Sequence, residues 1–280
     1  HIQAAQELMP TGPVTHGKAW IEMVHRYLAT GVGGLILFMC AWAWRMRWRG
    51  DRQVSVFWPT LTLFWVGLQG AFGALTVTMK LFPAIVTLHL LGGMTLLALL
   101  AHQAAQVQAS APAVRSSGHA VLLAGMLVLL LQIALGGWVS TNYAVLVCDS
   151  FPACQGSFWP DMSFAQGFQI WRPLGYTAWG ELLSFSALTA IHYVHRLAAY
   201  GVIACLLAMA WWLHQRQLRG HAKALALLVL MQFLSGLSNV VLGWPLPAAL
   251  LHTGGAAAML VVLVLAWHRT RLQPLSNITS

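Results

Sequence analysis

The chain has 280 residues, of which 59% are hydrophobic and only 8% are charged, far below the roughly 25% of charged residues in an ordinary soluble domain. This composition excludes a soluble globular protein and indicates an integral membrane protein. Fifteen Lys and Arg against six Asp and Glu give a net charge of +9. Because these charges occur in short connections between apolar runs, we attribute them to membrane topology and not to nucleic-acid binding.

Seven apolar runs reach the length of about 20 residues that a membrane-spanning helix needs. No signal peptide is predicted before them, because the N-terminal stretch is polar and contains Pro10 and Pro13. The predicted spans cover residues 24–45, 56–79, 83–104, 119–141, 184–213, 222–243 and 246–268.

Basic residues are concentrated on one side of these spans, in the connections after the first, third, fifth and seventh. That side holds ten of them, namely Arg45, Arg47, Arg49, Arg52, Arg115, Arg216, Arg219, Lys223, Arg269 and Arg271. The other side holds five, namely Lys18, Arg26, Lys80, Arg172 and Arg196. The positive-inside rule then places the C-terminus in the cytoplasm and the N-terminus outside. We predict a multi-pass protein of the cell (inner) membrane.

Two patterns in the chain occur twice. The pattern His-Arg-x-x-Ala-x-Gly begins at His25 and again at His195, and residues 69–92 align without a gap with residues 232–255, which places His89 opposite His252. Equivalent helices run in the same direction, so the repeat is parallel, as in some membrane proteins. All four histidines are expected near the outer ends of their spans.

These repeats predict two structural halves, residues 1–118 and residues 119–280. The span at 119–141 precedes the second His-Arg helix, so the first half should have a similar helix before residue 1. The predicted fold class is therefore an all-α membrane bundle of two pseudo-symmetric four-helix repeats. Seven spans lie in this sequence and an eighth is expected before residue 1.

A single histidine in a membrane helix usually hydrogen-bonds a neighbouring helix, but a repeated pair of histidines at one depth suggests ligands. Haem iron accepts imidazole axially, so a porphyrin between two helices needs one histidine from each. Small residues that could admit the macrocycle lie on the same helix faces, namely Ala29, Gly92, Ala199 and Gly255. Small residues also promote helix packing, so they support the haem interpretation without deciding it.

Three neighbours of the repeated histidines have two interpretations each. Arg26 and Arg196 either snorkel to the membrane interface or pair with haem propionates, which arginine binds bidentately. His192 lies three residues before His195 and competes with it for ligation, but it has no counterpart in the first half. The repeat therefore favours His195 as the ligand.

The connection from about residue 142 to 183 is the only long one and contains Cys148 and Cys154 around Pro152. Long connections are usually functional. In an oxidising outer compartment two such cysteines favour a disulfide over free thiols, whereas a metal site would need more ligands nearby.

Taken together, these features resemble the haem A synthase family. The residues that carry the resemblance are Glu22 to Arg26, His89, the Cys148–Cys154 loop, His195 with Arg196, and His252 with the two glycines that follow Thr253. The resemblance covers nearly the whole chain. It implies an eight-helix bundle that oxidises the C8 methyl group of haem O to a formyl group.

By position, the resemblance implies that His195 and His252 ligate a permanent haem b, while His25 and His89 hold the substrate haem. It also implies an electron donor, which the sequence does not identify. Haem O synthase and cytochrome oxidase subunits are further candidate partners, and membrane lipid surrounds the chain.

Two other functions fit repeated histidine pairs. A diheme b-type cytochrome would only transfer electrons, but it commonly places its haems near opposite membrane faces, whereas all four histidines here are expected near the outer face. A transporter built on repeated bundles is a further alternative. The sequence shows no pathway of acidic residues to support it, so the enzyme is favoured.

Glu22 stands one helical turn before His25, at the position where the second half has His192. Methyl oxidation with oxygen consumes protons, which a carboxyl group in an apolar pocket could deliver. The simpler interpretation is a surface glutamate in the first turn of a helix, favoured there by the helix dipole. Because Glu22 also matches the family's motif, we predict that it is catalytic.

Overall fold

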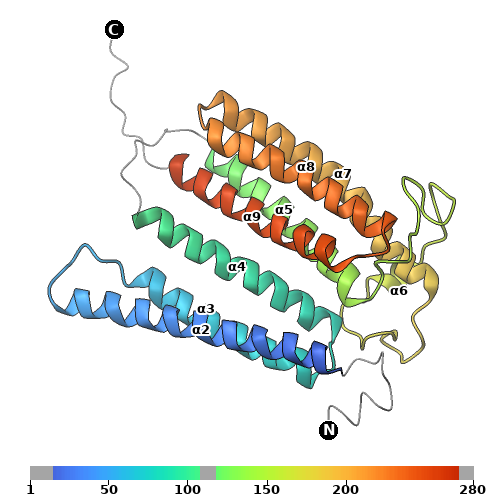
Figure 1. The fold of residues 1–280 in the computed structure, drawn as a ribbon, viewed down its shortest axis with the longest axis horizontal. Helices are drawn as coiled ribbons and strands as arrows, with labels where there is room; N and C mark the ends of the chain where they lie inside the picture. Colours follow the sequence, from blue (N-terminus) through green and yellow to red (C-terminus); the bar gives the residue numbers. More distant parts are fainter. Residues whose placement is uncertain (1–14, 108–117, 271–280) are drawn as a thin grey trace. The chain divides into compact units, whose positions relative to one another are not determined.

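The computed structural model describes residues 15–107 and 118–270 (Figure 1). Within these ranges seven helices are long and apolar enough to cross a membrane, which confirms the predicted spans. Arg115 and Arg271, two of the basic residues used for the topology, lie outside the described residues. The helices are α2 (His16–Trp48), α3 (Phe57–Thr78), α4 (Pro83–Val107), α5 (His119–Thr141), the short α6 (Phe164–Gly167), α7 (Phe185–Gln215), α8 (Arg219–Val241) and α9 (Leu246–Thr270).

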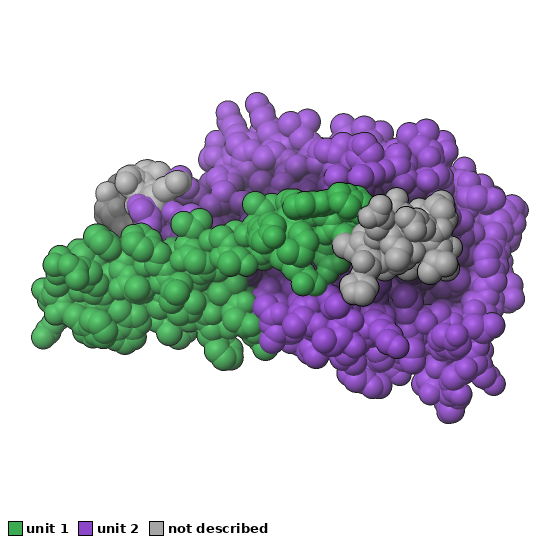
Figure 2. Space-filling model, turned by 60° about the horizontal axis from the view of Figure 1, so that its bottom comes forward, with its two compact units in different colours: residues 1–68 green, residues 69–280 purple. Residues whose placement is uncertain are grey.

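The chain divides into two compact units, residues 1–68 and residues 69–280, which Figure 2 shows in different colours. This boundary lies within α3 and differs from the repeat boundary after residue 118. The division into two sequence repeats therefore stays a prediction.

The first unit contains α2 and the beginning of α3. Trp44 Nε1 donates a hydrogen bond of 3.0 Å to Thr60 Oγ1, and the sulfur of Cys40 lies 3.7 Å from the same oxygen. Around these contacts Ile36, Cys40 and Ala43 are buried. Most other apolar side chains of α2 are exposed, as expected for a helix that faces lipid.

The second unit is a bundle of α4, α5, α7, α8 and α9. In chain order α5 packs against α4 and α7, α7 against α8, and α8 against α9, while α9 also contacts α4 and α5 (Figure 1). The interior is filled by leucines that are at most 1% exposed, namely Leu122, Leu129, Leu206, Leu213, Leu225, Leu260 and Leu263. These helices are apolar around their whole circumference because they meet either this core or lipid.

The connection between α5 and α7 is folded against one end of this bundle. Trp138 Nε1 donates to the carbonyl oxygen of Gly167 at 2.9 Å. Arg172 is fully buried, where its Nη2 donates to Asn142 Oδ1 at 2.6 Å and its guanidinium lies 5.5 Å from the ring centre of Trp138. Burial lowers the pKa of this guanidinium because it disfavours the charged form.

Candidate functional site

A cavity of about 310 Å³ lies in the second unit, bordered by α4, α5, α7, α8, α9 and the connection after α5. Its lining is mostly apolar, with side chains such as Leu129, Val202, Phe233 and Met259. Three histidines also line it: His192 and His195 from α7, and His252 from α9. Two of the four histidines singled out in the sequence thus share one cavity.

His195 is held by α5. Gln132 Nε2 donates to the backbone oxygen of His195 at 3.1 Å and also lies 3.1 Å from its ring Nδ1. One turn further along α5, a Cβ added to Gly136 would lie 3.0 Å from Cε1 of the same ring. Any side chain at position 136 would therefore crowd the ring of His195.

His252 is held in the same way by α8. Gln232 Nε2 donates to its backbone oxygen at 2.7 Å, and Ser235 Oγ lies 3.0 Å from its ring Nδ1. A Cβ on Gly236 would lie 3.1 Å from its Cε1. Each of the two rings thus lies against a glycine, while a glutamine fixes its backbone.

The arrangement occurs a third time around His89, also within the second unit. Gln69 Nε2 donates to the backbone oxygen of His89 at 2.6 Å, and a Cβ on Gly73 would lie 3.2 Å from its Cε1. The spacing Gln-x-x-x-Gly is the same in α3, α5 and α8. Residues four apart share a helix face, so each glutamine and its glycine meet the same histidine. The same two contacts, a glutamine hydrogen bond and a close glycine, therefore position His89, His195 and His252.

Two glycines that were expected to admit a macrocycle have another role. A Cβ on Gly92 would lie 2.2 Å from Oε1 of Gln69, and one on Gly255 would lie 2.5 Å from Nε2 of Gln232. These glycines therefore make room for the glutamines that bind the histidine backbones. Ala199, by contrast, does line the cavity.

His192 is buried beside His195 and lines the same cavity. Its Nδ1 lies 2.8 Å from the carbonyl oxygen of Ala144. Since a carbonyl oxygen only accepts, Nδ1 carries a proton and donates it there. The contact ties His192 to the connection after α5.

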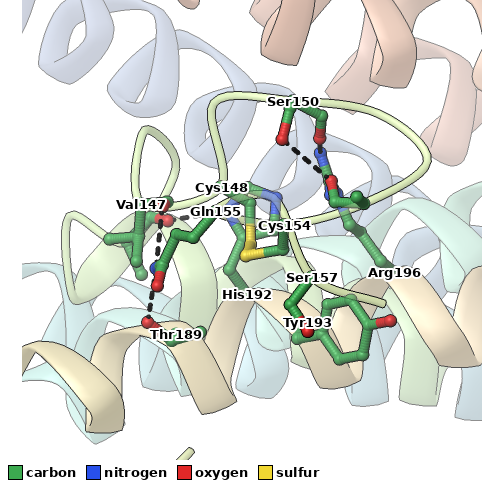
Figure 3. Close-up of a disulfide and its surroundings, with 12 residues drawn as sticks. Val147, Cys148, Ser150, Cys154, Gln155, Ser157, Thr189, His192, Tyr193 and Arg196 are labelled. Carbon is green, nitrogen blue, oxygen red and sulfur yellow. Dashed lines mark hydrogen bonds between the residues drawn. A yellow bond between two sulfur atoms is a disulfide. The ribbon is translucent and has the colours of Figure 1, made fainter. Parts of the chain in front are cut away.

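Arg196 is also bound by that connection. Its Nη2 donates to the carbonyl oxygen of Ser150 at 2.7 Å and its Nη1 to that of Ala153 at 3.2 Å (Figure 3). Its guanidinium lies 5.9 Å from the ring centre of Phe151. Arg196 lines the cavity as well. Its guanidinium has five N–H donors, which is more than these two hydrogen bonds use. Propionate binding by Arg196 stays a prediction.

Cys148 and Cys154 form a disulfide with their Cα atoms 4.7 Å apart, as predicted. The bonded loop lies over one face of α7 (Figure 3). On that face Gln155 Nε2 donates to Thr189 Oγ1 at 2.9 Å and Tyr193 donates its hydroxyl proton to the carbonyl oxygen of Phe158. Together with Arg196, these contacts fix the loop beside the cavity.

The first unit contains His25, Glu22 and Arg26 on α2. Arg26 Nη2 donates to Glu22 Oε1 at 2.5 Å, and both side chains are 53% exposed. The two side chains form an ion pair, because the spacing of four residues brings them together on one helix face. His25 is exposed, and the roles of these three residues stay predictions.

The residues that line the second-unit cavity are of the kinds that a haem site requires. Two imidazoles from different helices reach one apolar space, which is the ligand set that a six-coordinate haem takes. Glycine at positions 136 and 236 leaves room for the two rings, since a Cβ there would lie 3.0 or 3.1 Å from their Cε1 atoms. Near His195, Gln132 Oε1 is buried and has no hydrogen-bond partner among the described residues, so it remains available as an acceptor once the ring Nδ1 carries a proton.

The sequence interpretation missed the three glutamines and the three glycines one turn after them. A signal was present, since Gln-x-x-x-Gly occurs at residues 69–73, 132–136 and 232–236. This pattern could not be interpreted from the sequence, because only the structure places each glutamine and its glycine against a histidine of the next long helix.

Known proteins show which family this is. A family model described as cytochrome oxidase assembly protein matches residues 1–264. The haem A synthase of Shewanella oneidensis is 36% identical over 280 aligned residues, covering 96% of this chain and 83% of the relative. Those of Methylobacterium sp. (strain 4-46) and Alkalihalophilus pseudofirmus are 32% and 27% identical, covering 87% and 88% of this chain and 67% and 77% of the relatives. The chain therefore belongs to the family of cytochrome oxidase assembly proteins that includes these haem A synthases.

Proposed function

We propose that this protein is a membrane haem A synthase that oxidises the C8 methyl group of haem O to a formyl group, with haem b as its bound cofactor. Its family gives it a role in haem A biosynthesis. The observation that supports the proposal most is the second-unit cavity, which His195 and His252 both line.

The chain's residues provide the binding environment. His195 and His252 would ligate haem b, and the apolar lining would exclude water from it. Bound haem supplies the one-electron and oxygen chemistry that amino-acid side chains lack. Arg196 borders the same cavity and has N–H donors beyond those that bind the loop, so we assign it to a propionate.

The substrate haem is assigned by the sequence repeat. His25 and His89 are the counterparts of His195 and His252, and Arg26 is the counterpart of Arg196. Glu22 adds a carboxyl group near His25 that the second half lacks. We assign Glu22 the delivery of protons to the reaction, since general acids act within hydrogen-bond reach of the reacting group.

The membrane topology follows from the charges. The protein is a multi-pass membrane protein, and the excess of Lys and Arg after spans one, three, five and seven places the C-terminus in the cytoplasm. The haem sites then lie near the outer face of the inner membrane.

Identifying the extracted pigment tests this function. The protein is purified in detergent, its haems are extracted, and each is identified by chromatography and mass. We expect haem b together with haem O or haem A. Haem b alone in two equivalent sites would favour the diheme cytochrome, and a colourless protein after expression with haem O supplied would contradict both functions.

A further inference from the structure

The imidazoles of His195 and His252 in the second-unit cavity each have a polar side chain next to Nδ1. That neighbour is Gln132 for His195, with its amide nitrogen 3.1 Å from Nδ1, and Ser235 for His252, with its hydroxyl oxygen 3.0 Å from Nδ1. We propose, on the basis of the haem b site assigned above, that Gln132 and Ser235 are positioning residues that keep the proton of each ring on Nδ1, which leaves Nε2 for iron.

Ser235 carries the clearest evidence. A serine hydroxyl has one proton to donate. The carbonyl oxygen of Gln232 lies 3.2 Å from Oγ of Ser235 and can accept that proton, which leaves Oγ to accept a hydrogen bond from Nδ1–H of His252, 3.0 Å away. A neutral imidazole with its proton on Nδ1 has its lone pair on Nε2, the atom that can ligate a metal.

Gln132 offers His195 a donor and an acceptor on one amide. Its Nε2 donates to the backbone oxygen of His195, while Oε1 is buried and no residue in the described part of the chain donates to it. A buried acceptor without a donor is costly. A rotation of the amide about its Cγ–Cδ bond exchanges its two polar atoms. It gives up the hydrogen bond from Nε2 to the backbone oxygen of His195 and brings Oε1 toward Nδ1, where it accepts the proton that a ligating His195 must carry.

The hydrogen bonds of Gln132 and Ser235 would act on the iron through the imidazole rings. An acceptor at Nδ1–H orients the ring and raises the basicity of its other nitrogen, and loss of such a partner typically weakens metal binding roughly 10- to 100-fold. A stronger acceptor at Nδ1 should stabilise ferric iron and lower the haem midpoint potential. An apolar side chain there should raise that potential.

The test uses purified holoprotein with haem b bound, whose midpoint potential and low-spin electron paramagnetic resonance signal are measured. We expect Gln132→Glu to lower the potential, Gln132→Met and Ser235→Ala to raise it, and the two apolar variants to release haem roughly 10- to 100-fold more readily. Ser238→Ala is the matched control, because the Ser238 hydroxyl donates to the backbone oxygen of Ser235 and not to a histidine.

The outcomes separate this inference from the proposed function. Unchanged potentials and signals in Gln132→Met and Ser235→Ala, at full haem occupancy, would overturn the positioning roles and leave the haem site intact. A low-spin haem b that survives both His195→Ala and His252→Ala would instead remove the haem assignment on which the inference rests. If Gln132→Glu fails to fold, Gln132→Met and Ser235→Ala still decide the question.

Discussion

At the scale of single residues, the protein relies on a few polar groups in an apolar setting. His195 and His252 line one cavity, and each has its backbone oxygen bound by a glutamine of the neighbouring helix. In a membrane an unsatisfied polar group costs several kcal/mol. Each such residue therefore needs a defined partner.

We predict that His195→Ala and His252→Ala each remove the low-spin haem b spectrum, because each loses one of the two residues that would hold the haem iron. Optical and electron paramagnetic resonance spectra of purified protein measure this. Free imidazole in the buffer should restore part of the signal. A bis-imidazole spectrum retained by either variant would contradict the assignment.

Glu22→Gln is predicted to leave the haem b spectrum intact while abolishing the conversion of haem O to its alcohol and aldehyde products. The reason is that the amide keeps the size of the side chain but cannot deliver a proton. Haem analysis of cells that supply haem O measures the products. The control is Glu181→Gln, which makes the same change at a carboxyl group in the connection between α5 and α7. Near-normal product from Glu22→Gln would leave Glu22 as the partner of Arg26 in an exposed ion pair, since α2 begins at His16 and Glu22 lies beyond its first turn.

At the scale of elements, the candidate site depends on helix pairs. α5 carries Gln132 and Gly136 against α7, and α8 carries Gln232 and Gly236 against α9. Glycine at these two positions has a packing reason, because a Cβ there would approach a histidine ring to 3.0 or 3.1 Å.

Gly136→Val should weaken haem b binding, because its branched side chain must displace the ring of His195. Cavity overpacking costs roughly 1–3 kcal/mol, which corresponds to about a 5- to 150-fold loss of affinity. Haem stoichiometry after gel filtration measures the loss. Gly201→Val on α7 is the control, since a Cβ there meets nothing within 4 Å. Equal haem content in both variants would argue against the role of Gly136.

The disulfide loop is predicted to stabilise the end of α7 that carries His192 and Arg196. Opening so short a loop by Cys148→Ser should cost about 2 kcal/mol and release the carbonyl groups that bind Arg196. Thermal unfolding of the unreduced protein should therefore begin at a lower temperature in the variant, with Cys205→Ser as the control at a free cysteine. Identical unfolding curves would show that the α7 contacts hold the loop without the bond.

At the scale of the whole molecule, the second unit is one bundle. The hydrogen bonds of His192 and Arg196 lie at the end of this bundle that meets the connection after α5. The other helix ends of the bundle carry basic residues such as Arg216, Arg219 and Arg269. This asymmetry is what orients a membrane protein.

Reporter fusions check the orientation. Green fluorescent protein joined after residue 280 should fluoresce, because the C-terminus is predicted in the cytoplasm, and alkaline phosphatase joined there should be inactive. Alkaline phosphatase inserted after Gly156, in the loop between α5 and α7, should be active. The reverse pattern would invert the topology and place the haem sites at the cytoplasmic face.

The class of fold and the helix boundaries, to within a few residues at most ends, could be predicted from the amino-acid sequence. Apolar length and charge act locally along the chain, so they can be read without packing; the main exception is α2, which begins at His16 and not near residue 24. The repeated histidines and the cysteine pair were also readable, because each is a short pattern.

How those residues are used depends on the packing of the helices. The tertiary structure placed His195 and His252 on one cavity, showed that Gly92 and Gly255 accommodate glutamines, and placed the guanidinium of Arg196 against the carbonyl groups of the disulfide loop. Each of these facts joins residues that are 20 to about 60 positions apart in the chain. Their contacts depend on which helix faces meet, and in a bundle whose helices are apolar all round, no sequence period marks those faces.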